Sequence, residues 1–161
     1  MNKYKFIKYN KNYPKLFEKE KEKLKKIIPS AKIEHVGSTA VDGLGGKGII
    51  DILVSVPKKD LTRVKNKLIK SNYYNLSRAW RKDRISFYKD SKLLKKRRVH
   101  IHLTFKNSKI EKQAIKFRDL LRKNKKLRNK YSSVKEKAIK LKKKSKDYRD
   151  FKYNFIEETV K

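Results

Sequence analysis

Residues 35–56, HVGSTAVDGLGGKGIIDILVSV, contain the stretch that decides the fold. The second half, IIDILVSV at 49–56, predicts a buried strand because it is a short apolar run rich in β-branched residues. Asp51 interrupts that run. Burying a lone carboxylate costs several kcal/mol unless a cation or hydrogen bonds meet it. Strand alternation places Asp51, Leu53 and Ser55 on one face, so Asp51 is either a site residue or one partner of a structural ion pair.

The loop before this strand, GSTAVDGLGGKG at 37–48, is dense in glycine and hydroxyl side chains. Backbone N–H groups in loops of this composition can cradle a phosphate. The alternative interpretation of the glycines is a tight turn, which needs no ligand.

A second cluster of candidate site residues lies in RVHIHLTF at 98–105. Alternation puts Arg98, His100, His102 and Thr104 on one strand face. Two histidines at i and i+2 lie close enough to bind one metal ion or one phosphate, although such residues also occur on ordinary half-polar strands. The third histidine, His35, directly precedes the Gly-Ser loop, and this clustering favours a site.

The remaining pattern indicates an α+β protein. Apolar spacing predicts helices at 14–28 and 61–69. Strands are expected at 33–37, 49–56, 73–78, 84–89 and 98–105. From Ile110 onward the period is helical, with two helices and a last amphipathic one. Strands first and helices last predict a sheet followed by a helical hairpin packed on it, in a single domain with a sheet core at 1–108 and a helical part at 109–161.

The charge is the most unusual feature of the composition. The chain has 49 Lys and Arg against 16 Asp and Glu, a formal net charge of +33. The excess lies in the second and third segments, because 57–110 carry 18 basic and 3 acidic residues and 111–161 carry 19 and 7. Such a field attracts polyanions, which favours nucleic acid as a partner. The excess of lysine could instead reflect the codon bias of an AT-rich genome. That bias should also raise the number of glutamates, which is low here.

Several classes of protein are excluded. The chain has no cysteine, so neither disulfides nor thiolate metal sites can form. The N-terminus, MNKYKFIKYN, lacks the apolar run of a signal peptide, and no stretch reaches transmembrane length. We therefore expect a soluble cytoplasmic protein without a membrane partner; its oligomeric state is not defined by the sequence.

Several segments resemble those of a known family. IEHVGSTAVDGLGGKGIIDILVSV (33–56) resembles the signature of the GrpB family, a branch of the nucleotidyltransferase-fold superfamily. YNKNYPKLFEKEKEKL (9–24) is similar to the family's opening helix, and VHIHLTF (99–105) to its His-x-His strand. FRDLLRKNKKLRNKYSSVKEK (117–137) and DYRDFKYNFIEE (147–158) resemble its helical C-terminal half. The resemblance covers nearly the entire chain and implies a nucleotidyltransferase-like mixed sheet with flanking helices.

The resemblance also implies a mechanism. In nucleotidyltransferases a Gly-Ser pair holds the triphosphate, and carboxylates on a following strand bind magnesium. Gly37 and Ser38, with Thr39 and Lys47 of the same loop, match the phosphate-binding part. Asp51 matches the first carboxylate, which makes it the expected catalytic residue and a metal ligand.

Two departures from the superfamily pattern alter the expected metal site. Leu53 occupies the position of the second carboxylate, and the strand that should bring the third carries His100 and His102. One carboxylate with two imidazoles is a poor magnesium site but suits manganese or zinc. The expected cofactor is therefore a divalent metal (magnesium, manganese or zinc) held by Asp51 and the two histidines. Smaller departures are Asp42 and Gly48, where the family has proline.

Two functional hypotheses follow from these residues. The first is an enzyme that transfers a nucleoside monophosphate from a nucleoside triphosphate to a hydroxyl, with RNA favoured as acceptor by the charge. The second is a catalytically degenerate nucleotidyltransferase fold that binds a nucleotide or RNA without turnover. Arg84 is a further nucleotide-binding candidate, since a sheet-face arginine needs an anionic partner. The helix residues Arg118, Arg122, Lys135 and Lys152 either extend the ligand groove or are ordinary solvated residues.

Overall fold

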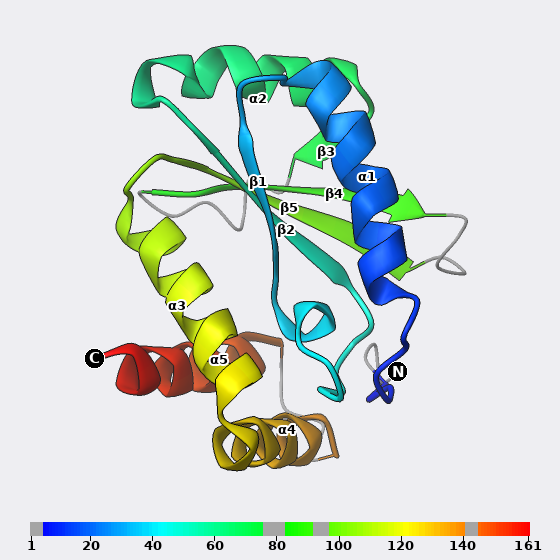
Figure 1. Cartoon of the computed structure of the whole chain (residues 1–161), viewed down its shortest axis with the longest axis vertical. Coiled ribbons are helices and arrows are strands. Elements are labelled where there is room, and N and C mark those ends of the chain that lie inside the picture. Colours follow the sequence, from blue (N-terminus) through cyan, green and yellow to red (C-terminus); the bar gives the residue numbers. More distant parts are fainter. Residues whose placement is uncertain (1–4, 76–82, 92–96, 141–144) are drawn as a thin grey trace.

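The computed structural model describes residues 5–75, 83–91, 97–140 and 145–161 of the chain, and its centre is a mixed β-sheet (Figure 1). The five strands lie in the order β1-β2-β5-β4-β3. Their bounds are β1 Lys32–Val36, β2 Ile50–Val56, β3 Tyr74–Asn75, β4 Ile85–Ser91 and β5 Arg97–Phe105. β2 and β5 are parallel and the other neighbours are antiparallel. The predicted strand at 73–78 is described only as far as Asn75, and its remaining residues lie outside the described part.

One face of the sheet packs against α1 (Tyr13–Ile27) and α2 (Leu61–Lys70). The main core contains the aliphatic residues of alternate strand positions together with the apolar faces of these two helices. Ile52, Ile101 and Phe87, from three adjacent strands, are completely buried in it. Because alternation sends these side chains to one face, Asp51 and the two histidines of β5 must point to the other.

The other face carries the C-terminal helices α3 (Lys109–Lys123), α4 (Lys125–Lys140) and α5 (Ser145–Val160). Figure 1 shows them gathered together, away from α1 and α2. They form a second apolar cluster that also includes two residues of the Gly-rich loop; its buried members are Val41, Leu44, Phe117, Leu121, Tyr131 and Val160. The helical part thus packs directly on the loop that precedes β2.

The start of α3 shows how the sequence sets this packing. Ser108 is the N-cap and accepts a hydrogen bond from the Glu111 backbone N–H at 3.1 Å, while the Glu111 carboxylate accepts one from the Asn107 N–H at 2.5 Å. This reciprocal arrangement resembles a capping box, which fixes where a helix begins. Within the described ranges, none of the helices combines the length and apolar character that crossing a bilayer requires.

Candidate active site

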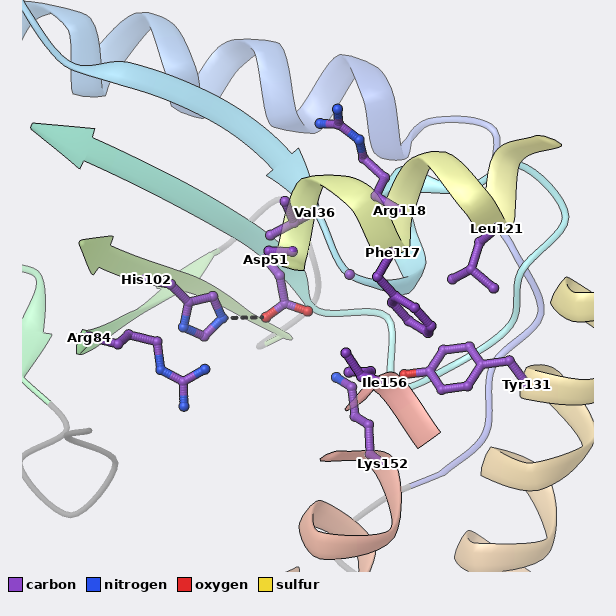
Figure 2. A pocket seen from close by; sticks show the side chains of 12 residues that line it. Val36, Asp51, Arg84, His102, Phe117, Arg118, Leu121, Tyr131, Lys152 and Ile156 are labelled. Carbon is purple, nitrogen blue, oxygen red and sulfur yellow. Dashed lines mark hydrogen bonds and ion pairs between the residues drawn. The ribbon is translucent and has the colours of Figure 1, made fainter. Parts of the chain in front are cut away.

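Asp51 lies on β2 beside the two histidines of β5. In the parallel register, Asp51 faces His100, and Leu53 faces His102. The Asp51 Oδ1 atom lies 3.3 Å from His102 Nε2 and 3.6 Å from His100 Nδ1, and Figure 2 shows the His102 contact. The structure therefore brings together the carboxylate and both imidazoles that the sequence singled out. All three side chains are largely buried, with 18 to 25% of each exposed.

The charge state of this group follows from its surroundings. Burial acts to raise the pKa of Asp51, but the hydrogen bond from His102 and the electrostatic attraction of His102, His100 and Lys152 lower it more, so that the pKa lies below its ordinary value. Burial lowers the pKa of His102 despite the adjacent carboxylate. At neutral pH the pair is therefore an ionised Asp51 and a neutral His102.

The tautomer of His102 bears on metal binding. A neutral imidazole that faces a carboxylate oxygen with Nε2 must carry its proton there. Its Nδ1 atom is buried and has no hydrogen-bond partner among the described residues. A histidine that bound a metal through Nε2 would carry its proton on Nδ1, where no described acceptor meets it, so Nε2 of His102 fits a hydrogen-bond donor to Asp51 better than a metal ligand atom. Within the described ranges no set of three or more His, Cys, Asp or Glu residues is arranged to hold a metal ion.

The glycines of the loop are required by close packing around the site. Gly37 has φ 74° and ψ −171°, a conformation that is essentially restricted to glycine. A Cβ atom at Gly37 would lie only 2.4 Å from Asp51 Oδ2, and one at Gly46 would lie 2.5 Å from Ser38 Oγ. The loop backbone therefore lies directly against the carboxylate and the serine that were predicted to act together.

Thr39 makes buried hydrogen bonds that stabilise this loop. Its side chain is almost fully buried. The hydroxyl donates to the carbonyl oxygen of Ile49 at 3.0 Å and lies 2.9 Å from His35 Nε2, from which it accepts. His35 itself stacks on Phe17 of α1, with ring centroids 4.5 Å apart, and burial lowers its pKa to about 4. His35 is a neutral core residue on the α1 side and does not join the other two histidines, contrary to the expectation of one cluster.

We predict that Thr39→Val destabilises the fold. Valine keeps the shape but leaves the Ile49 carbonyl and the His35 ring without their buried partner, at a cost of about 2–3 kcal/mol. The free energy of unfolding from urea titration measures this change. Thr62→Val, at an exposed position on α2, is the matched control, and equal losses in the two variants would contradict the structural role of Thr39.

A pocket opens beside Asp51, between the sheet and the C-terminal helices (Figure 2). Its empty volume, which includes space open to solvent, is about 590 Å³. Asp51, His102 and the cations Arg84 and Lys152 line its polar part. The apolar wall comes mainly from the helices; its residues are Val36, Ala114, Phe117, Leu121, Tyr131 and Ile156. Sequence reasoning missed this wall, because apolar residues at helical spacing predict a core face.

Lysines from three elements lie around the loop and the pocket. Burial, and then the charge of Lys152, lower the pKa of Lys47 to about 8 and that of Lys135 to about 7. The Lys135 Nζ atom donates to the Gly45 carbonyl oxygen at 2.5 Å and lies 4.6 Å from the centroid of the Tyr131 ring. Because burial disfavours the charged form of these lysines, a nearby anion would stabilise their ammonium groups.

Arg118 and Arg122, the two arginines of the helices that the sequence singled out, make contacts within the fold. Arg118 of α3 is buried; its Nη1 atom donates to Glu34 Oε2 at 2.7 Å and to the His35 carbonyl oxygen at 3.0 Å. Arg122 donates to the Ala40 carbonyl oxygen at 3.0 Å. These two arginines join α3 to β1 and to the short 3₁₀ turn Ser38–Ala40. Arg118 also lines the pocket wall.

This combination of a mixed sheet, a Gly-Ser turn and an aspartate on the following strand defines a protein of the nucleotidyltransferase fold. A structure of the Cid1 poly(U) polymerase with MgGTP bound aligns with a TM-score of 0.53 and 19% identity, covering 80% of this chain and 42% of that one. The GLD-2/RNP-8 complex aligns with a TM-score of 0.56 and 17% identity, covering 82% and 45%. At these identities the likeness establishes the fold alone.

The chain belongs to the GrpB family, because the family model described as GrpB protein matches residues 3–161. The "Glutamate-rich protein GrpB" of Alkalihalophilus pseudofirmus is 34% identical over 160 residues, covering 96% of this chain and 92% of the relative. The crystal structure of the conserved protein GrpB from Enterococcus faecalis has a TM-score of 0.74 and 22% identity, covering 98% of this chain and all of that one. The predicted family and fold class are confirmed. In contrast to the glutamate-rich character in that relative's name, this chain is strongly basic.

Proposed function

We propose that this protein is a metal-dependent nucleotidyltransferase that transfers a nucleoside monophosphate from a nucleoside triphosphate to a hydroxyl group of RNA. The observation that carries the proposal is the ionised Asp51, held against the Gly37 turn at the mouth of a pocket with a basic part and an apolar wall. A nucleotide has the same two parts, an anionic triphosphate and a flat, largely apolar base.

The residues divide between the two parts of such a substrate. Lys47, Lys152 and the Gly37–Ser38 turn supply positive charge and backbone N–H groups for the phosphates. Phe117 and Tyr131, whose rings pack edge to face with centroids 5.1 Å apart, line the apolar part of the pocket that would receive the base. Arg84, on the opposite side of Asp51 from the apolar wall in Figure 2, would contact the incoming acceptor strand or the phosphates.

Transfer would exchange one phosphorus–oxygen bond for another. The acceptor hydroxyl oxygen bonds to the α-phosphorus, the bond from that phosphorus to the bridging oxygen breaks, and pyrophosphate leaves while the hydroxyl proton passes to solvent or a nearby base. The cationic groups around the loop offset the negative charge on the leaving group. His102 holds the Asp51 carboxylate in place through its hydrogen bond.

In this proposal the divalent metal is magnesium, which the protein and the phosphates of the substrate would bind together. Magnesium is usually bound by one or two carboxylates together with substrate phosphates, with no all-protein cage. Asp51 can supply that carboxylate, which agrees with the lack of a three-ligand group among the described residues. When bound, such an ion would orient the phosphates and neutralise charge on pyrophosphate.

One observation favours the second hypothesis, a nucleotide-binding module without turnover. Leu53, at the position of the second carboxylate, is 1% exposed and lies between Glu34 and His102 in the register. Strand β2 therefore offers Asp51 as its one carboxylate.

The test is to incubate the purified protein with each α-³²P-labelled nucleoside triphosphate, a single-stranded RNA and Mg²⁺ or Mn²⁺. We expect label in the RNA with at least one nucleotide, and none when EDTA removes the metal. Nucleotide binding is measured separately by equilibrium dialysis in the same buffer. Binding without transfer would support the binding module, and the absence of both would contradict the two hypotheses together.

A further inference from the structure

A row of side chains runs across the sheet from the candidate active site to the opposite edge. Asp51 faces His100 in the β2–β5 register, His100 faces Tyr88 in the β5–β4 register, and Tyr88 faces Tyr74 in the β4–β3 register. Directly opposed residues of neighbouring strands project to the same face. With strands about 4.8 Å apart, the row is about 14 Å long.

The outer part of this row is an aromatic surface accessible to solvent. Tyr74 is 56% exposed, the largest value among the large hydrophobic residues of the described part. Its ring lies 5.3 Å from that of Tyr88, at an interplanar angle of 31°. Neither tyrosine lines the pocket beside Asp51, so this surface is continuous with the candidate site through His100 without being part of the nucleotide pocket.

The sequence of the segment that contains these strands is strongly basic, which favours an anionic ligand. Residues 71–105, which contain β3, β4 and β5, carry ten Lys and Arg against two Asp. One of the two acidic residues, Asp90, is on the same face two positions beyond Tyr88 and faces Arg98 in the register. Arg84, directly before β4, lies four positions from Tyr88 and so falls on the same face by alternation; it also lines the pocket. Aromatic rings within a basic region bind single-stranded nucleic acid, because every base has a face that can stack.

We propose that Tyr74 and Tyr88 form a stacking platform for unpaired bases of RNA, and that the row leads the end of the strand to Asp51. This inference rests on the proposed function, in which RNA is the acceptor, and it assigns the binding surface for that acceptor. The platform binds single strands in preference to duplexes, whose bases are already stacked on one another and are not available to the tyrosines.

The test compares Tyr74→Ala with wild type for binding a fluorescein-labelled ten-nucleotide single-stranded RNA, by fluorescence anisotropy at fixed salt. Loss of one stacking contact weakens binding about 5- to 160-fold. Because Tyr74 is exposed, its truncation leaves the fold intact, which circular dichroism checks. Tyr153→Ala on α5, which is 37% exposed, is the matched aromatic control, and we expect it to bind within about twofold of wild type. Duplex RNA binding should be unchanged in both variants.

The outcomes separate this inference from the proposed function. Weaker single-strand binding in Tyr74→Ala alone supports the platform, whether or not the wild type transfers nucleotides. Equal loss in Tyr153→Ala, equal loss for duplex RNA, or no single-strand binding by wild type overturns the platform. Nucleotide binding and transfer to a small hydroxyl acceptor can survive that result, because the pocket does not include either tyrosine.

Discussion

Replacing Asp51 by asparagine is expected to reduce nucleotide transfer at least about 1,000-fold. Asparagine keeps the size of the side chain and can still meet His102, but it removes the ionised carboxylate that the low pKa of Asp51 maintains at neutral pH. The loss of several kcal/mol of electrostatic stabilisation at a metal-dependent step corresponds to this factor, since each 1.36 kcal/mol is tenfold in rate. The measurement is the initial rate of label transfer to RNA.

Asp42→Asn is the matched control for this prediction. Asp42 belongs to the loop before β2 and is exposed, so the substitution removes the same charge at a nearby place in the sequence and should leave the rate within about twofold of wild type. Circular dichroism and urea unfolding establish that both variants fold. Full activity in Asp51→Asn would refute a catalytic role for this carboxylate.

The sequence predicts the inner part of the site well because strand alternation is a geometric rule. A side-chain period of two assigns Asp51, His100 and His102 to faces without knowledge of the fold, and the structure confirms those faces. The buried aspartate was recognisable because its burial requires compensation, and the compensation is now visible in His102 and the lysines around it. The helix positions were equally predictable from their apolar spacing.

The parts that were not predictable depend on contacts between distant segments. Phe117 and Tyr131 lie at helical spacing, which indicates a buried face but not that this face borders a pocket. Lys135 is one of 49 basic residues, and its burial against Gly45 depends on how α4 docks on the loop. Likewise, the involvement of His35 with Phe17 and Thr39 could be seen only once β1 and α1 were placed together.

The second large effect is expected for Gly37→Ala, which should both destabilise the protein and abolish transfer. Two physical reasons act together. Alanine is strained at φ 74° and ψ −171°, which costs about 1–3 kcal/mol, and its Cβ atom would lie 2.4 Å from Asp51 Oδ2. Relieving that overlap must move either the turn or the carboxylate, and either shift disturbs the arrangement of the turn and Asp51 that the proposed transfer requires. We expect unfolding free energy to fall by about 3–5 kcal/mol.

Gly43→Ala separates these two causes. Gly43 has a similar φ of 73°, but a Cβ atom there would meet nothing within 4 Å. It should therefore lose only about 1 kcal/mol from backbone strain and retain transfer activity. Urea titration and the rate of label transfer are measured on both variants. If the two variants are equally stable and equally active, the close approach of the Gly37 turn to Asp51 is not needed for transfer. Gly37 would then be required only for the conformation of the turn.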